Sequence, residues 1–113
     1  MIGKIKGKLI EVDHNIGLID TASGVAYNVY LTPQLISQFK PPDSISIYTY
    51  LQVREEALVL FGFESKQQFK LFQQLLTVPG VGPKTAFNAI SFAKTDDMMK
   101  AIKNSIDNGI PID

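Results

Sequence analysis

Two segments with helical spacing of apolar residues are joined by residues 76–86, which read LTVPGVGPKTA. Gly80 and Gly82 bracket one apolar residue, Val81, which can lie against a pair of helices. Glycine adopts backbone conformations that are closed to other residues, so this spacing permits a sharp turn whose N–H groups point outward at a helix start. The stretch therefore predicts a helix-hairpin-helix turn, and such a turn can bind an anion.

The charge of this turn favours phosphate as the anion. N–H donors lie at the positive end of a helix dipole, and Lys84 adds a formal charge in the first helical turn. A phosphate held in this way is bound without any base being read, so we expect binding that is independent of nucleic-acid sequence. A glycine turn that only packs two helices together is the alternative. The candidate phosphate-binding residues are Gly80, Val81, Gly82, Lys84 and Thr85.

Other glycine-rich phosphate motifs fit this stretch less well. A P-loop needs a glycine directly before its lysine, where Pro83 stands, and a dinucleotide fingerprint needs a third glycine where Thr85 stands. Helix-hairpin-helix DNA glycosylases share the Gly-x-Gly turn and have a downstream catalytic Asp, for which Asp96 or Asp97 could serve. Those enzymes have a helical domain before the hairpin, whereas the residues before this hairpin are typical of strands.

Helical patterns flank the turn on both sides. Ser65 can cap the first helix, and Pro83 favours the first position of a second helix that runs to about Phe92. A third helix is expected after a cap at Thr95 or Asp96. The apolar residues that carry these patterns are Phe69, Phe72, Leu75, Leu76, Ala86, Phe87, Ile90, Met98, Met99 and Ile102.

The first 63 residues are rich in β-branched and aromatic residues and are interrupted by turn formers. One short helix is expected over residues 33–39. Five short strands with one helix between them suit a small closed barrel of the OB type. We therefore predict an α+β chain with two small domains, an OB-fold barrel over residues 1–63 and an all-α helix-hairpin-helix domain over residues 64–113. The expected strands cover residues 2–10, 17–21, 25–31, 44–53 and 57–63.

The composition excludes several classes of protein. The chain has 113 residues and no cysteine, so disulfides and thiolate metal sites are excluded. No apolar run approaches a bilayer span, and lysines interrupt the N-terminus, so we expect a soluble, cytoplasmic protein without a membrane partner. The 11 basic and 11 acidic residues cancel. Charge is nevertheless segregated, since residues 65–113 carry six Lys against four Asp, while residues 41–64 carry one Arg against four acids.

Two acidic residues, Glu55 and Glu56, follow Arg54 between two apolar strand segments. This position predicts an exposed hairpin tip. No His, Cys or third carboxylate stands nearby at ligand spacing, so we assign neither a metal site nor catalytic residues. A solvated charged turn remains the alternative.

Three lysines, Lys4, Lys6 and Lys8, alternate along the first expected strand and share one face of it. They can form a phosphate-facing rim or a solvated strand face. Aromatic residues in the later strands can stack on bases, but their alternation favours packing in the barrel. These aromatic residues are Tyr27, Tyr30, Tyr48, Tyr50, Phe61 and Phe63.

The order of these motifs is that of a known family. The chain begins with MIGKIKG at residues 1–7, continues with VREEA at 53–57 and LFGF at 60–63, and reaches GVGPK at 80–84. It resembles the bacterial RuvA family of Holliday junction branch migration subunits over essentially all 113 residues. The resemblance implies an OB-fold domain, a second domain with two helix-hairpin-helix motifs, and a third domain that docks the RuvB ATPase motor.

The resemblance also implies a function and partners. Four copies would form a homotetrameric plate on which four-way junction DNA lies flat, with a RuvC-type resolvase in the same pathway of recombination and repair. ATP and Mg²⁺ would be used by the motor, so we expect no cofactor and no chemistry of its own for this accessory helicase subunit. A general single-strand or duplex DNA-binding module, and a scaffold whose hairpin binds protein, are the alternatives.

In that family two acidic residues of the first domain form a pin near the junction centre. By match of sequence context the pin here would be Glu55 and Glu56; the second residue is usually aspartate, so the charge is kept. The family continues into a second Gly-x-Gly hairpin and a motor-binding domain, whereas this sequence ends at Asp113. A truncated form without the RuvB-docking region is therefore expected.

Overall fold

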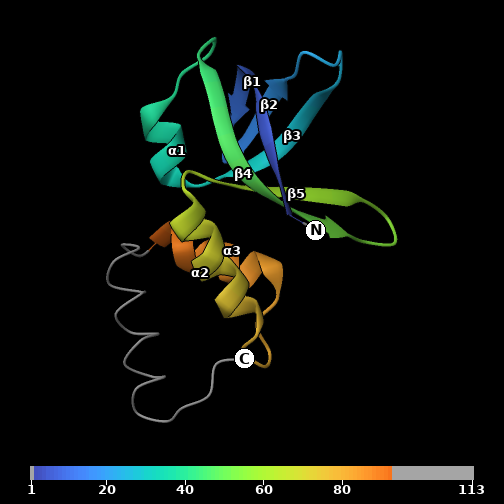
Figure 1. Ribbon diagram of the computed structural model, residues 1–113, viewed down its shortest axis with the longest axis vertical. Helices are drawn as coiled ribbons and strands as arrows, with labels where there is room; N and C mark the ends of the chain where they lie inside the picture. Colours follow the sequence, from blue (N-terminus) through green and yellow to red (C-terminus); the bar gives the residue numbers. More distant parts are fainter. Residues whose placement is uncertain (1, 93–113) are drawn as a thin grey trace. The chain divides into compact units, whose positions relative to one another are not determined.

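The structure, a computed structural model, describes residues 2–92. The chain divides into two compact units, residues 1–65 and residues 66–113. Figure 1 labels the elements of both units. The first unit contains strands β1 (Ile2–Asp13), β2 (Ile16–Asp20), β3 (Ala26–Leu31), β4 (Ser44–Val53) and β5 (Leu58–Phe63), with helix α1 (Pro33–Gln38). The described part of the second unit contains helices α2 (Lys66–Leu76) and α3 (Pro83–Phe92).

The five strands close into a barrel in the order β1-β2-β3-β5-β4. All neighbours are antiparallel except β3 and β5, which run parallel, with Val29 opposite Leu60. Closure leaves no open sheet edge, so backbone groups along each strand can find partners on both sides. The predicted five-stranded barrel followed by helices is confirmed.

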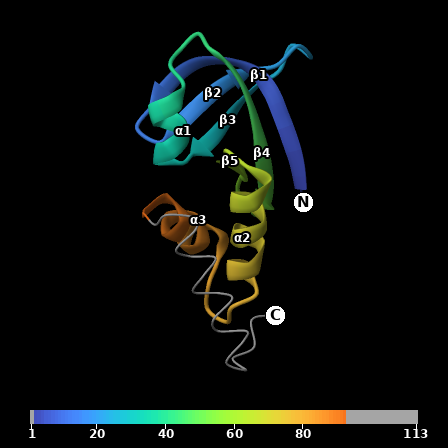
Figure 2. The same ribbon diagram turned by 60° about the vertical axis from the view of Figure 1, so that its left-hand side comes forward.

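Strand β1 serves two sides of the barrel because it changes partner at Lys8. Residues 2–8 pair with β4, and residues 8–13 pair with β2. Figure 2 shows the curvature that carries β1 from one neighbour to the other. The strand expected over residues 2–10 therefore extends to Asp13, because its last residues form the hairpin with β2.

A β-bulge accompanies this change of partner. The register of β1 against β2 shifts between Leu9 and Glu11, and a bulge of this kind bends a strand and increases its twist. A Cβ atom on Gly7 would collide with the backbone carbonyl of Asp20. The two strands therefore approach one another too closely for any side chain at Gly7.

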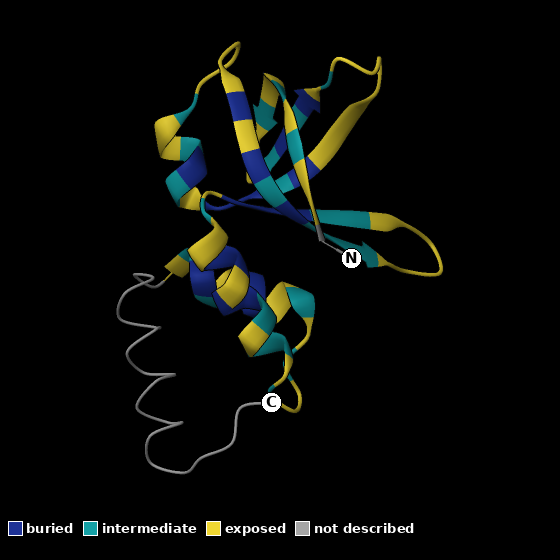
Figure 3. Cartoon of the chain, viewed as in Figure 1, coloured by how far each residue is buried: buried dark blue, intermediate teal, exposed yellow. Residues whose placement is uncertain are grey.

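Buried apolar side chains alternate with more exposed ones along β2 and the first part of β4, whereas β5 ends in three buried residues (Figure 3). Helix α1 starts where the Thr32 hydroxyl accepts a hydrogen bond from the Leu35 N–H, with Pro33 at its first position. Its Leu35 side chain is buried in the barrel core. The core residues are Leu9, Ile19, Val29, Leu31, Leu35, Ile45 and Ile47.

Helices α2 and α3 have the bounds that their apolar spacing predicted, and each buries one face. The buried residues of α2 include Phe69 and Phe72, and those of α3 are Ala86, Phe87 and Ile90. The third helix expected after Thr95 or Asp96 lies outside the described residues. Across residues 2–92, every helix is too short or too polar to cross a bilayer.

Candidate nucleic-acid interface

The turn between α2 and α3 is held by backbone hydrogen bonds that follow the end of α2. The N–H of Val78 donates to the carbonyl of Leu75, and the N–H of Val81 donates to the carbonyl of Val78, both at 3.1 Å. The Thr77 hydroxyl donates to the carbonyl of Gln74 at 2.6 Å. These bonds close the chain into the predicted sharp turn and leave Val81 half-buried.

The two glycines of the turn have different roles. Gly80 has a φ of +86°, a left-handed conformation that side chains rarely adopt. Gly82 has no positive φ, and a Cβ built on either glycine would meet no atom within 4 Å. The expectation that both glycines need special backbone conformations is therefore confirmed for Gly80 and wrong for Gly82. What glycine provides at position 82 is an uncovered backbone that a ligand can approach.

Gly82 also marks the start of α3. Its carbonyl accepts the first helical hydrogen bond, from the N–H of Ala86 at 3.0 Å. The N–H groups of the first helical turn have no partner inside a helix, so those of Lys84 and Thr85 are free to meet an anion. Both side chains are exposed. The candidate residues Gly80, Gly82, Lys84 and Thr85 thus lie on an exposed surface at a helix N-terminus.

Charge around this turn has one sign. Residues 66–92 contain three lysines, Lys66, Lys70 and Lys84, and no acidic residue. All three lysines are exposed. A short helical region with only positive charges attracts phosphate through its formal charge and through the helix dipole.

The β4–β5 loop carries charge of the opposite sign. It covers residues 54–57, and the N–H of Arg54 donates to the carbonyl of Ala57 at 2.9 Å. Both carboxylates, on Glu55 and Glu56, are exposed at the tip of this hairpin, as predicted. Figure 1 shows the loop extending away from the body of the barrel. The position allows the two carboxylates to contact a large ligand before the barrel itself does.

The part of the chain that the structure describes contains no cluster of metal-binding side chains. Nowhere within residues 2–92 do three His, Cys, Asp or Glu side chains gather closely enough to hold an ion. The single histidine, His14, pairs at the surface with its neighbour Asp13, at 2.8 Å from Nδ1 to Oδ1. Barrel packing, which was expected for the strand aromatics, holds for Phe61 and Phe63, which are buried, and the rings of Tyr30 and Phe61 stack at 5.4 Å between centroids. Tyr27 is exposed.

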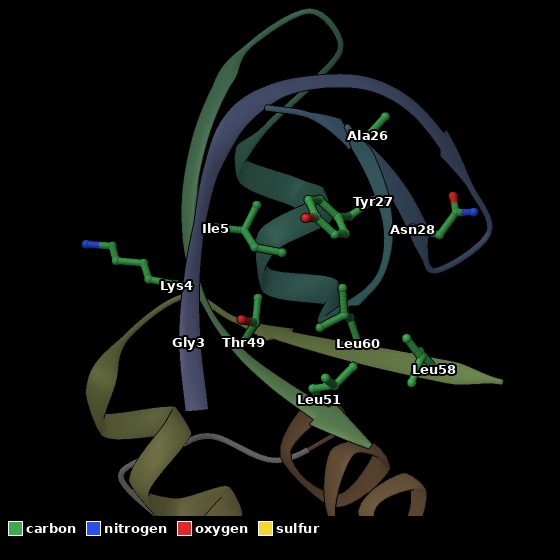
Figure 4. A pocket seen from close by; sticks show the side chains of 10 residues that line it. All are labelled: Gly3, Lys4, Ile5, Ala26, Tyr27, Asn28, Thr49, Leu51, Leu58 and Leu60. Carbon is green, nitrogen blue, oxygen red and sulfur yellow. The ribbon is translucent and has the colours of Figure 1, made fainter. Parts of the chain in front are cut away.

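A hollow of about 500 Å³ opens at one end of the barrel interior. Figure 4 shows Ile5, Thr49 and Leu60 directed into it, while Lys4 points away. Its walls are mainly apolar, so it offers mostly packing surface. Sequence reasoning did not find this hollow, because it depends on how far apart β1, β3 and β5 lie at the barrel mouth.

Comparisons with known proteins agree on one family. The model of the RuvA N-terminal domain family matches residues 1–62. The Holliday junction branch migration complex subunit RuvA of Lachnospira eligens is 35% identical over 103 residues, which are 90% of this chain and 49% of that protein. The subunit of the same name from Bdellovibrio bacteriovorus is 37% identical over 116 residues, covering 98% of this chain and 59% of that protein. The chain spans about half the length of the curated relatives it matches.

Proposed function

The chain belongs to the RuvA N-terminal domain family, and from that membership we propose that it binds four-way junction DNA as a subunit of a branch migration complex. The observation that carries this proposal is the separation of charge. Residues 66–92 have no acidic residue, whereas the β4–β5 tip presents two exposed carboxylates. A general DNA-binding module has no use for carboxylates at an exposed tip, but a junction has a centre where strands must be kept apart.

The α2–α3 turn supplies the attraction. A phosphate approaching Gly82 meets no side chain there, and it can accept hydrogen bonds from the N–H groups of Lys84 and Thr85. The Lys84 ammonium group adds an ionic contact. Because every one of these groups addresses the backbone of DNA, we expect this contact to be independent of base sequence.

The β4–β5 tip supplies the repulsion. In a homotetramer, each of four copies would bring Glu55 and Glu56 toward the crossover of the junction. Like charge would repel the phosphates there and hold the strands apart while the arms exchange. Attraction along the arms and repulsion at the centre together explain how a chain with no net charge binds a polyanion.

The partners follow from the same role. An accessory subunit that positions a junction leaves ATP hydrolysis, with its Mg²⁺, to a RuvB-type motor, and a RuvC-type resolvase would act on the junction that the complex holds. The subunit itself would carry out no covalent chemistry and would work in the cytoplasm, where the chromosome is.

The test is a comparison of two DNA shapes. The purified chain is titrated against a synthetic four-way junction and against linear duplex of the same length, each over a series of salt concentrations. We expect tighter binding of the junction, with both affinities falling as salt rises. Equal affinity for the two DNAs would favour a general DNA-binding module, and binding without salt dependence would favour a scaffold for protein.

A further inference from the structure

A row of lysines lies on the outer face of the barrel, along strand β1. Lys4, Lys6 and Lys8 occupy alternate positions of β1, and the core residue Leu9 belongs to the opposite, inward set. Paired residues of an antiparallel ladder project on the same side of the sheet. The cross-strand partners of the three lysines on β4 are Tyr48, Ser46 and Ser44, in that order.

These six residues form one polar surface, which we call the β1–β4 lysine face: Lys4, Lys6, Lys8, Ser44, Ser46 and Tyr48. The lysines and serines are exposed and Tyr48 is half-buried. Within residues 2–92, no carboxylate lies within ion-pair distance of any of the three lysines. The Lys4 Nζ atom sits 5.1 Å from the centre of the Tyr48 ring, a cation–π contact that keeps this ammonium group on the face.

The surface is hollowed beside its central lysine. A depression of about 420 Å³ is lined by Lys6 on one side and by Ser44 and Ser46 on the other. Ala22, in the β2–β3 loop, forms part of its wall. Gly7 and Ile45 complete the lining, which is mainly apolar, and Lys6, Ser44 and Ser46 are its members whose side chains can donate hydrogen bonds to an anion.

The surrounding charge makes this face distinctive. The first 65 residues contain seven acidic and five basic residues, and three of those five are the lysines of this face. Asp20 is the β2 partner of Lys8 and therefore projects on the same side of the sheet at the Lys8 end of the row. The row thus concentrates positive charge on one side of a unit that is acidic as a whole. A polyanion is therefore attracted to this face.

We propose that the β1–β4 lysine face binds the phosphodiester backbone of a nucleic-acid strand. Alternate residues of a strand are about 6.5 Å apart, so the three ammonium groups form a row whose spacing is of the same order as that between successive phosphates of an extended strand. The hydroxyl groups of Ser44 and Ser46, which lie opposite Lys8 and Lys6 on β4, can donate hydrogen bonds to the phosphate oxygens. The outer surface of β1 and β4 differs from the surface over strands 2 and 3 through which OB folds bind oligonucleotides.

This site does not depend on the junction role proposed for the hairpin and the acidic tip. The experiment therefore uses Lys84→Ala as its starting chain, so that the hairpin contact is already weakened. Into that background are placed either Lys6→Gln with Lys8→Gln or, as a control of equal charge, Lys40→Gln with Arg54→Gln, whose side chains are exposed elsewhere on the barrel. Binding of a labelled oligothymidine strand and of a duplex of equal length is measured over a series of salt concentrations.

We expect the Lys6/Lys8 pair to weaken single-strand binding and to lower the slope of log affinity against log salt by about 1.4, since each phosphate contact contributes about 0.7. The control pair should leave the slope unchanged. If duplex binding changes in the same way, the face binds the backbone of both single-stranded and double-stranded DNA. Equal losses of affinity for the two pairs of substitutions would show that only the total charge of the chain matters, and would overturn the proposal.

A second measurement locates the contact directly. Amide resonances of the original chain are followed by NMR as the oligothymidine strand is added. We expect shifts at Lys6, Ser44 and Ser46 in addition to those at the α2–α3 turn, and inorganic phosphate at the same ionic strength should reproduce the former only weakly, because it engages one contact of the row. Shifts confined to residues 78–85 would show that the β1–β4 lysine face binds no DNA.

Discussion

Arg54 and Ala57 close the β4–β5 loop through a backbone hydrogen bond of 2.9 Å, and Glu55 and Glu56 occupy the turn between them. The bond involves only main-chain atoms, so neither glutamate is needed to keep the turn closed. Both carboxylates are exposed. Their charge can therefore be removed without altering the hairpin that presents it, which makes them suitable for a clean test of repulsion.

Replacing both glutamates, as Glu55→Gln with Glu56→Gln, should tighten DNA binding and reduce its preference for four-way junctions. Loss of one carboxylate–phosphate repulsion in water is worth about 1 kcal/mol at close range, or about fivefold in affinity. The measurement is the ratio of junction affinity to duplex affinity. Glu11→Gln with Asp13→Asn removes two exposed carboxylates elsewhere on the barrel. An identical change of this ratio in both variants would show that Glu55 and Glu56 form only a solvated charged turn.

Lys84→Ala should weaken DNA binding by a similar factor for every DNA sequence. The side chain is exposed at the first turn of α3, where it can contact phosphate but no base. Loss of one duplex phosphate contact should lower the slope of log affinity against log salt by about 0.9. Lys40→Ala, an exposed position on the barrel, is the matched control. A loss that varies with base sequence would contradict a pure backbone contact.

Gly80→Ala and Gly82→Ala should separate stability from binding. At Gly80 the left-handed backbone makes any side chain unfavourable, so the free energy of unfolding should fall by about 1–2 kcal/mol. At Gly82 the new methyl group meets no protein atom, so stability should change little while DNA affinity falls, because the methyl group covers the backbone that phosphate approaches. Thermal unfolding and junction binding are measured on each variant. Unchanged affinity for Gly82→Ala would remove this residue from the interface.

Gly62→Ala should destabilise the barrel by about 1–3 kcal/mol, because the added Cβ would lie 2.7 Å from the Ile47 Cδ1 atom and 2.9 Å from a methyl group of Val29. Ile47→Val removes the nearer of these atoms and should recover part of the loss. Chemical denaturation of the two single variants and the double variant gives the coupling energy. Strict additivity would show that the crowding is relieved elsewhere.

Local patterns in the sequence account for much of this architecture. Proline at a first helical position and apolar spacing predicted α3 over its observed bounds, and alternation predicted β4 over residues 44–53. The position of Glu55 and Glu56 between two apolar strand segments predicted the exposed acidic tip. In each case the deciding interactions lie within a few residues, so a single stretch of sequence contains the necessary information.

What sequence reasoning missed depends on contacts between distant residues. The extension of β1 to Asp13 follows from its change of partner at Lys8, which no local pattern encodes. The Gly-x-Gly spacing allowed special backbone conformations at both glycines of the turn, whereas of the two only Gly80 has a positive φ. The hollow beside Lys6 requires Ser44 and Ser46 from another strand.

The change of partner in β1 also sets the order in which its strand pairs can form while the chain is being synthesised. Its hairpin with β2 joins residues close in sequence and can form as soon as both strands have emerged from the ribosome. The pairing of Ile2 with Tyr50 must wait for β4, and closure needs β5 to enter between β3 and β4. Contacts so far apart form slowly, so the first half of β1 remains an unpaired strand edge during translation. The charges of the lysines along that half then disfavour pairing of this edge with other nascent chains.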